Sequence, residues 1–359
     1  MKKILFIANS DRHIKLCHLP YLKMFHDNNY VVHVATNTRD ILPFCDKKIK
    51  LSLTRHPFSL GNIKALFVIR KIVKQENYDL ISCHTPMGGF LGRISIINQH
   101  LKTKVFYTAH GFHFYKGSSI INWLIYYPIE KYLARYTTCL FTMNKEDYIL
   151  AKTKFSCDTY KIKGIGFELE RLKIKKEANI LKQELNIQDE FIVTYIAEIS
   201  KRKRQKELIK TLKKIDLKKE NIKILLIGDS LIKNFNHYLK KYSNIIYLGF
   251  KEDIGSYLNI SDLVISSSSQ EGLPLNIMEA IYFNKTIIAT NIRGNKDLLN
   301  NYPNSLLVNN LDELVKEFIN YKNNPKLLTN NYNIERYMVE NVKKDIKKIY
   351  NKYLESRLK

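Results

Sequence analysis

The sequence predicts an α/β protein built from two doubly wound parallel sheets. Short apolar runs typical of buried strands alternate with helical patterns along the whole chain, and this series occurs twice. The chain has 359 residues, which is long for one hydrophobic core. Strands that alternate with helices form parallel sheets covered on both faces, and ligands bind at the carboxyl ends of their strands. Candidate functional residues are therefore expected in the loops that follow strands.

The first half of the chain carries the first series. Its expected strands are residues 4–8, 31–35, 80–84, 105–108 and 140–143, and its expected helices are residues 15–26, 63–75 and 123–135. The second half repeats the plan. Its expected strands are residues 192–197, 222–228, 245–248, 263–266 and 286–290, and its expected helices are residues 205–215, 275–282 and 311–321.

The joint between the two series is expected near Gly164-Ile165-Gly166, where two glycines precede a charged stretch. We therefore expect a first domain over residues 1–165 and a second over residues 166–334. The remaining segment, residues 335–359, carries a long Lys-rich helical pattern, and we expect this helix to cross back onto the first domain.

Composition limits the protein class. Hydrophobic residues make up 45% of the chain and aromatic residues 11%, enough for globular folding. The cysteines, at positions 17, 45, 83, 139 and 157, have no paired spacing, so we expect reduced thiols without a disulfide framework or a zinc site. No secretory signal is evident, and the uncharged run over residues 117–129 is too short to span a bilayer. These features predict a soluble or membrane-surface protein.

The net charge of +25 suggests an anionic partner. Residues 1–165 contain 25 basic and 10 acidic residues, against 34 and 24 in residues 166–359, so the excess is denser in the first half. Nucleic acid and an anionic membrane surface carrying a phosphorylated lipid are both compatible with it. The other interpretation is compositional, because many lysines merely solvate helix faces in a chain rich in Lys, Asn and Ile.

The most informative motif is a pair of carboxylates, Glu271 and Glu279, around a Gly/Pro turn. Glu271 is expected in the loop after the strand at 263–266, and Glu279 about one turn into the following helix. A helix N-terminus favours an anionic ligand, so one acid near a sugar and one near a ribose, with a diphosphate between them, would suit a nucleotide-sugar enzyme. The alternative is that Glu271 caps the helix and Glu279 is solvated.

Here the residues resemble a known family. The segment 266–280 resembles the E-x7-E signature of family 4 retaining glycosyltransferases. Residues 107–114, which read Tyr-Thr-Ala-His-Gly-Phe-His-Phe, resemble the catalytic loop of bacterial capsule and exopolysaccharide members. His18-Leu19-Pro20 and residues 84–89 occur where that subgroup has its acceptor-side loops, and residues 289–295 resemble the strand and loop after the E-x7-E helix. All these segments come in the family's order. The resemblance implies the GT-B fold, in which two Rossmann-like domains face each other across a cleft.

The resemblance also implies how the donor diphosphate is bound. Lys203, in a basic run that follows a strand and precedes a helix, occupies the position of the family's diphosphate-binding lysine. Glu198 stands where the family has an arginine, so Arg202 or Arg204 is expected to supply the second cation. The other interpretation of this run is solvated surface. No D-x-D-like acidic cluster follows a strand, so we expect no metal and no cofactor; fixed positive groups stabilise the leaving phosphate instead.

The resemblance assigns catalytic roles to His110, which follows the strand at 105–108, and to Glu271, which would contact the sugar. His113 is close enough to compete with His110. Glu279 would bind the ribose hydroxyls. Further donor contacts are expected from Gly249, Phe250, Gly272, Leu273, Leu275 and Asn276.

The acceptor side is assigned to loops of the first domain. The candidates are Asn9, Arg12, His13, His84 and His113. An apolar and aromatic stretch over residues 120–127, flanked by Lys116 and Lys131, follows the catalytic loop. It is either a helix that dips into the membrane interface or a core helix.

These expectations combine into one function. We expect a retaining, metal-independent glycosyltransferase that moves a hexose or N-acetylhexosamine from a UDP-sugar to a polyprenyl-diphosphate-linked saccharide, in the cytoplasm and peripheral on the inner face of the plasma membrane. One alternative is a GT-B UDP-sugar 2-epimerase, which needs no acceptor. Another is a basic nucleic-acid-binding protein, but no aromatic-basic recognition motif supports a nucleic-acid partner. No motif specifies the donor sugar, the acceptor linkage or the oligomeric state.

Overall fold

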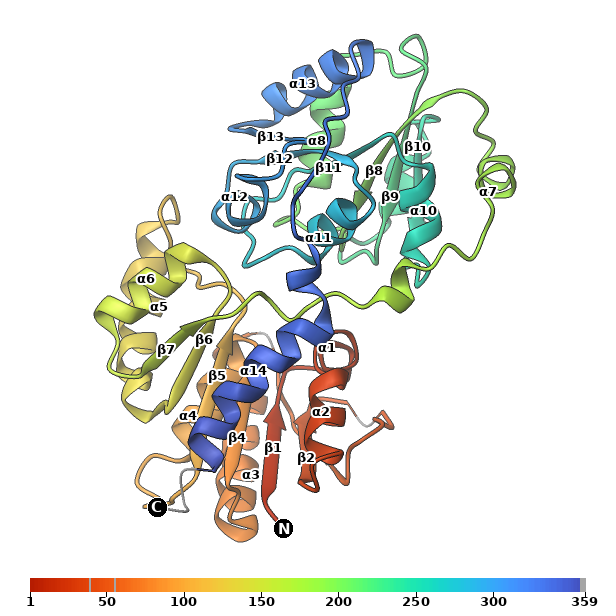
Figure 1. Ribbon diagram of the computed structural model, residues 1–359. Coiled ribbons are helices and arrows are strands. Elements are labelled where there is room, and N and C mark those ends of the chain that lie inside the picture. The colour runs from red at the N-terminus through yellow and green to blue at the C-terminus, as the bar shows by residue number, and fades with distance from the viewer. Residues whose placement is uncertain (39, 55, 356–359) are drawn as a thin grey trace. The chain divides into compact units, whose positions relative to one another are not determined.

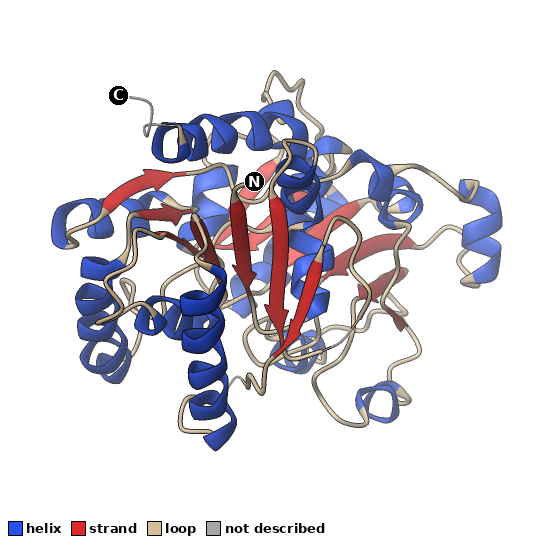
Figure 2. Ribbon diagram, turned by 90° about the horizontal axis from the view of Figure 1, so that it is seen from below, coloured by secondary structure: helices blue, strands red, loops and turns tan. Residues whose placement is uncertain are grey.

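The computed structural model describes residues 1–38, 40–54 and 56–355. The chain divides into two compact units, Met1–Gly166 with Val339–Lys359, and Phe167–Met338. Each unit is an α/β domain with a parallel sheet between helices (Figures 1 and 2). The predicted fold class is confirmed. Residues 356–359 of the expected final helix lie outside the described residues.

The sheet of the first unit has the order β3-β2-β1-β4-β5-β6-β7. Its strands are β1 (Lys3–Ile7), β2 (Val31–Thr36), β3 (Lys47–Lys50), β4 (Leu80–His84), β5 (Lys104–Ala109), β6 (Cys139–Thr142) and β7 (Asp158–Lys161). The sequence did not predict β3 and β7. Both are short, partly exposed and carry lysines, as is common for strands at the edges of a sheet, so they lack a buried apolar run.

Helices cover both faces of this sheet. They are α1 (Asp11–Cys17), α2 (Leu19–His26), α3 (Leu60–Glu76), α4 (Pro86–Ser95), α5 (Ile120–Leu133), the 3-10 turn η1 (Ala134–Tyr136), α6 (Lys145–Lys154) and α14 (Val339–Leu354). The single helix expected over residues 15–26 is wrong, because the chain breaks at His18. Pro20 has no N–H to bond Leu16, and its ring would clash with that carbonyl. The break leaves His18 buried at the junction of α1 and α2.

The final helix, α14, packs on the sheet of the first unit (dark blue in Figure 1). The Tyr350 ring stacks on Phe106 of β5, with ring centroids 4.9 Å apart. The Tyr350 hydroxyl lies 3.2 Å from the Ser82 hydroxyl of β4, and the Lys2 ammonium donates to the Leu354 carbonyl at 2.8 Å. The last helix is thus part of the core of the first unit.

The second unit has a sheet of order β10-β9-β8-β11-β12-β13. Its strands are β8 (Phe191–Ile196), β9 (Ile222–Ile227), β10 (Ile245–Gly249), β11 (Leu263–Ser266), β12 (Thr286–Thr290) and β13 (Ser305–Val308), of which only β13, an edge strand, was not predicted. Its helical segments are η2 (Leu169–Leu172), α7 (Ala178–Glu184), α8 (Gln205–Leu212), α9 (Phe235–Leu239), α10 (Ile254–Ile260), α11 (Leu275–Tyr282), α12 (Arg293–Leu299), α13 (Leu311–Asn323) and η3 (Glu335–Tyr337). Two apolar clusters, one including α10 and α11 and the other α8 and α13, form its core.

Both sheets have the same topological switch point. Strand order reverses between β1 and β4 in the first unit and between β8 and β11 in the second. Ligands of open parallel sheets bind outside the carboxyl ends of the strands at such a point. The loops that begin at Ala8 and Thr85, and those that begin at Ala197 and Ser267, are therefore the places to look for a site.

The apolar stretch beside the expected catalytic loop forms α5, and its two faces differ. Trp123, Tyr126 and Tyr127 pack against the core of the first unit. The aliphatic side chains Ile120, Ile121, Leu124 and Ile125 are exposed, Leu124 to 71%. The core interpretation thus holds for the aromatic face, and the aliphatic face is exposed. No helix in the described ranges is long and apolar enough to cross a membrane.

Candidate functional site

In the second unit, the loop after β8 positions Lys203 at the switch point. This loop turns at Ser200, whose carbonyl accepts a hydrogen bond from the Lys203 N–H at 3.2 Å. The Lys203 carbonyl in turn accepts from the Tyr195 hydroxyl and from the Ser267 hydroxyl, both at 2.8 Å. The backbone of Lys203 is thus attached to strand β8 and to the loop after β11, and its side chain is almost wholly buried.

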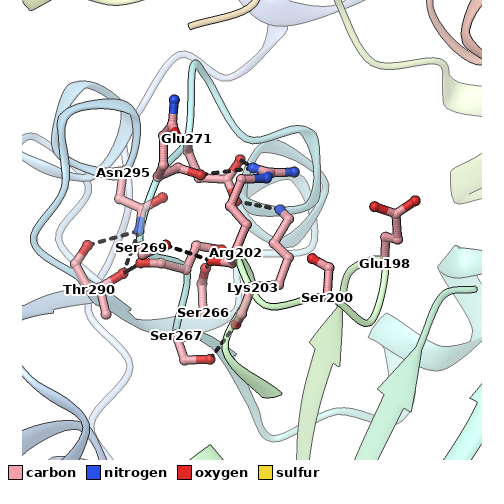
Figure 3. Close-up of polar contacts among 12 residues, drawn as sticks. Glu198, Ser200, Arg202, Lys203, Ser266, Ser267, Ser269, Glu271, Thr290 and Asn295 are labelled. Atoms are coloured by element: carbon pink, nitrogen blue, oxygen red, sulfur yellow. Dashed lines mark hydrogen bonds and ion pairs between the residues drawn. The ribbon is translucent and has the colours of Figure 1, made fainter. Parts of the chain in front are cut away.

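The serines that follow β11, residues 267–269, form hydrogen bonds with the same loop (Figure 3). The Ser269 N–H and hydroxyl both donate to the Arg202 carbonyl, at 2.9 and 3.0 Å. The Ser268 carbonyl accepts from the Thr290 hydroxyl at 2.6 Å, and the Thr290 carbonyl accepts from the Asn295 amide at 2.8 Å. This network joins the loop after β8, the loop after β11 and the end of β12. It holds the backbone of the basic run, in which Lys203 is buried while Lys201 and Arg202 remain exposed.

Glu271 lies against this basic run. Its carboxylate accepts hydrogen bonds from the Lys203 ammonium and, at 3.1 Å, from the Arg202 guanidinium. Burial favours the neutral acid, but the two cations outweigh it, so the pKa of Glu271 is lowered. Helix α11 begins at Leu275 without a side-chain cap, so the alternative interpretation of Glu271 as a capping residue is wrong.

Glu279 lies on α11 and is 1% exposed, so the alternative interpretation as a solvated helix residue is also wrong. Its Oε1 atom lies 3.6 Å from Nε of Arg171 in η2, and neither atom has a hydrogen-bond partner among the described residues. Burial raises the pKa of Glu279, and Arg171 offsets this in part. Because buried polar atoms are nearly always paired, this carboxylate has capacity for further hydrogen-bond donors.

Arg171 was missed by sequence reasoning. It belongs to the charged stretch after Gly166, which has the composition of a linker. No periodicity marks it, since η2 spans only Leu169–Leu172. The pairing with Glu279 arises from the fold alone.

The other expected donor residues follow β10 and β11. Gly272 and Leu273 belong to the loop before α11, and Leu275 and Asn276 open that helix. The buried Asn276 amide nitrogen has no hydrogen-bond partner among the described residues. A Cβ atom on Gly294 would lie 2.7 Å from the Gly272 carbonyl oxygen, so a glycine at the start of α12 allows that helix to approach this loop.

The remaining donor-side candidates lie elsewhere. Gly249 ends β10, the edge strand on the β9 side of the sheet, with a φ of 66°, and the Phe250 ring that follows is 41% exposed. Arg204 takes a left-handed conformation, with a φ of 60°, at the N-cap of α8. Of the two arginines considered as partners for Lys203, it is Arg202 that joins Lys203 at Glu271.

In the first unit, four histidines gather at the switch point. His13 lies on α1, His18 follows α1, His84 ends β4 and His110 follows β5. The Nε2 atoms of His13 and His18 are 3.3 Å apart. The ring centroids of His13 and His110 are 4.8 Å apart, and those of His18 and His84 are 3.7 Å apart. We call His13, His18, His84 and His110 the histidine cluster.

Burial is the main cause of the electrostatics of the histidine cluster. It lowers the pKa of His18, His84 and His110 well below the ordinary value, and the neighbouring imidazoles lower it further. These rings are therefore neutral at pH 7. His18 was recognised only as part of the motif His18-Leu19-Pro20 and was not singled out as a site residue; Pro20 after it is the signal that could have located the break in the helix.

The other acceptor-side candidates surround the cluster loops. The Asn9 side-chain oxygen accepts from the Thr85 hydroxyl at 2.9 Å, which joins the loops after β1 and β4. Thr85 has a φ of 64°, which is uncommon for a β-branched residue and characteristic of functional loops. Arg12 is exposed on α1. His113 stacks on Tyr126 of α5, with ring centroids 4.7 Å apart.

Residues 177–345 match the family described as glycosyl transferases group 1, and residues 3–144 match the family described as glycosyl transferase 4-like. The chain is 37% identical to the putative glycosyltransferase EpsD of Bacillus subtilis over 317 residues, which is 86% of this chain and 83% of that protein.

Two further proteins are more distant. The UDP-Gal:alpha-D-GlcNAc-diphosphoundecaprenol alpha-1,3-galactosyltransferase of Escherichia coli is 26% identical over 85% of this chain and 82% of its own length. The crystal structure of Anabaena Alr3699/HepE in complex with UDP and glucose superposes with a TM-score of 0.77 and 19% identity, over 98% of this chain and all of that chain. At that identity the superposition shows a shared fold.

Proposed function

Because the chain belongs to the group 1 and 4-like glycosyltransferases and is such an enzyme, we propose that it transfers a hexose or N-acetylhexosamine from a UDP-sugar to a lipid-diphosphate-linked saccharide during exopolysaccharide or capsule assembly. The E. coli relative, whose name gives UDP-Gal as donor and a diphosphoundecaprenol acceptor, supports both substrate classes. The observation that carries the proposal is the buried Lys203–Glu271 pair, with the exposed Arg202 beside it, at the switch point of the second unit.

This group suits the chemistry of the leaving diphosphate. When the bond between sugar and phosphate breaks, negative charge grows on the departing phosphate, and fixed cations there lower the barrier. Lys203 and Arg202 supply two positive charges against one from Glu271, so a net positive charge remains for the diphosphate. The N–H groups at the start of α11 add a further anion site. We propose that these groups stabilise the leaving diphosphate without a metal ion or cofactor.

Glu279 and Arg171 suit the nucleoside. The two hydroxyls of a ribose are hydrogen-bond donors, and the buried Glu279 oxygen is an acceptor with no partner among the described residues. We assign Glu279 to the ribose and Glu271 to the sugar. Retention of the anomeric configuration is part of the proposal and rests on the resemblance to retaining enzymes.

The acceptor is assigned to the first unit. His110, at the carboxyl end of β5, is the proposed catalytic histidine, which contacts the donor sugar or helps to orient the reacting groups. The exposed aliphatic face of α5, together with the excess of basic residues in this half of the chain, suits the anionic inner face of the plasma membrane, where a polyprenyl-linked acceptor resides. We therefore propose peripheral attachment through this face.

The test is a screen of UDP-sugars against polyprenyl-diphosphate saccharides with mass detection of the products. We expect one UDP-sugar to yield an acceptor extended by one sugar, with an α linkage by NMR if the donor is an α-linked UDP-sugar. Glu271→Gln and His110→Ala are expected to lower turnover at least 100-fold, while Glu207→Gln, an exposed carboxylate on α8, leaves it unchanged. Conversion of the UDP-sugar without an acceptor would identify an epimerase instead.

A further inference from the structure

The histidine cluster has the geometry of a metal site. One ring nitrogen from each of His13, His18 and His110 lies within 4.8 Å of the others. Their ring centroids form a triangle with sides of 4.8, 5.1 and 5.7 Å. Three imidazoles on a tetrahedral Zn²⁺, with nitrogens about 2.0–2.1 Å from the ion, have ring centroids about 5 Å apart. The arrangement of the three rings therefore agrees with a three-histidine centre.

Two of the ring nitrogens lie at the distance expected between two ligands of one metal ion. The Nε2 atoms of His13 and His18 are 3.3 Å apart, and two ligands on neighbouring corners of such a tetrahedron are about 3.3–3.4 Å apart. The third ring is also prepared, since Nε2 of His110 is buried and has no hydrogen-bond partner among the described residues. A buried nitrogen without a partner is rare and indicates capacity for a ligand.

The His18 ring is held in place by a fourth histidine, His84. The His84 ring packs on His18, with an angle of 35° between the rings. Nε2 of His84 lies 3.0 Å from the Ser82 hydroxyl, which lies 3.2 Å from the Tyr350 hydroxyl of α14. Groups that orient ligand rings are a regular part of metal sites. Because His84 packs against the His18 ring, with centroids 3.7 Å apart, we assign it the role of supporting that ring and not of sharing an ion with it.

The donor set selects the type of metal. Imidazoles alone suit Zn²⁺ and its first-row neighbours, whereas Mg²⁺ and Mn²⁺ prefer oxygen ligands. We propose that His13, His18 and His110 bind one divalent transition-metal ion of the Zn²⁺ class, with the fourth position open to water or to an oxygen of the acceptor. We expected no metal from the sequence, because no D-x-D-like acidic cluster follows a strand. His110 is far from His13 and His18 along the chain, so no ligand spacing links the three residues.

Metal binding is tested directly, with no sugar substrate, so its outcome is independent of the proposed transfer reaction. The full chain, stripped with chelator and dialysed, is titrated with Zn²⁺ by calorimetry and with Co²⁺ by visible absorption. We expect one equivalent of each ion, the intense d–d bands of tetrahedral Co²⁺, and no saturable binding of Mg²⁺. His18→Ala is expected to weaken Zn²⁺ binding at least tenfold.

The matched control is His26→Ala, which removes an exposed histidine from α2 and is expected to leave Zn²⁺ binding unchanged. Because His18 is buried, His13→Ala, at a partly exposed position, is measured beside it to separate lost ligation from lost folding. A cluster held only by hydrogen bonds predicts no bound equivalent in the parent chain. That result, or equal Zn²⁺ binding by the parent and by a folded His13→Ala chain, would overturn the proposal.

Discussion

Replacing Glu271 by glutamine is expected to change nucleotide binding and turnover in opposite directions. Glu271 is the carboxylate that pairs with Lys203 and Arg202. A diphosphate that binds these cations must compete with it. Glutamine keeps the shape and one acceptor oxygen but removes the charge, so Lys203 becomes more available to the diphosphate. Glu271→Gln is therefore expected to bind UDP more tightly while it transfers sugar at least 100-fold more slowly.

The size of the effect follows from the exposure of the three side chains. Lys203 and Glu271 are 10% and 8% exposed, so their hydrogen bond is scarcely screened, whereas Arg202 is 46% exposed and is discounted. A hydrogen bond to a charged group contributes about 1.5–3 kcal/mol and a neutral one about 0.5–1.5 kcal/mol. Glutamine at position 271 therefore costs about 1–2 kcal/mol of stability in the absence of nucleotide. If the diphosphate recovers that energy, UDP binds about 5- to 30-fold more tightly.

Calorimetry measures both quantities. Scanning calorimetry of the parent and the Glu271→Gln chain without nucleotide is expected to show the transition of the second unit lowered by about 2–8 °C, since about 2–4 °C corresponds to 1 kcal/mol for a domain of this size. Saturating UDP is expected to raise the transition more in Glu271→Gln than in the parent. Titration calorimetry then gives the two UDP dissociation constants.

Glu207→Gln is the control for loss of one negative charge, because Glu207 is exposed on α8, the helix that follows Lys203. It is expected to change neither UDP affinity nor the size of the shift produced by UDP. Unchanged or weaker UDP binding by Glu271→Gln would refute the reasoning, since it would mean that the diphosphate does not compete with Glu271 for Lys203.

Three further outcomes are expected. Burial raises the pKa of Glu279, so the folded state binds the carboxyl proton more tightly than the unfolded chain; the stability that this proton adds is complete below about pH 4.5 and is lost as the pH rises through the folded pKa. Glu279→Gln should therefore raise the melting temperature at pH 7 but weaken UDP binding about tenfold. It should also abolish the decline of UDP affinity that the parent chain shows as the pH falls toward that pKa, which titration calorimetry from pH 4.5 to 8 checks. Glu198→Arg restores a cation at the position where the family resemblance predicts one and should tighten UDP binding about 3- to 10-fold, as measured by the same titration; weaker binding would contradict it. Ile121→Glu with Leu124→Glu should reduce co-sedimentation with anionic vesicles at least fivefold, whereas Leu327→Glu, at an exposed leucine of the second unit, should not; equal losses would contradict attachment through α5.

Much of the fold could be predicted because buried parallel strands have a strong local signal. The runs that became β1 and β11 are continuous apolar segments, since both faces of each strand are covered. The edge strands β3 and β7 lack that signal, because both have exposed lysines (Lys47, Lys50 and Lys161) and become strands by pairing with a neighbour. The break at His18 was visible in Pro20 but was overridden by the apolar pattern around it.

The candidate site residues also differ in how far the sequence could reveal them. Glu271 and Lys203 are recognisable because each belongs to a short motif with a fixed place after a strand. Their contact with each other is not visible in the sequence, because 68 residues separate them and the serine run supplies the link. Arg171 belongs to no motif, and His18 belongs to one that assigned it no contact. Only the folded chain reveals that they face Glu279 and His13.

The two units have the same kind of switch point, but the site of the second unit is charged and that of the first is neutral. In the second unit the loop after the central strand β8 carries Lys203 and faces a carboxylate, so its ligand position is charged and suits a diphosphate. In the first unit the segments after β1 and β5 and the last residue of β4 supply His18, His110 and His84, which burial keeps neutral. Neutral imidazoles add nothing to the net charge of +25, so attraction to an anionic membrane must come from the surface lysines and arginines instead. Membrane attachment should therefore weaken with salt while UDP binding at the buried Lys203 changes much less.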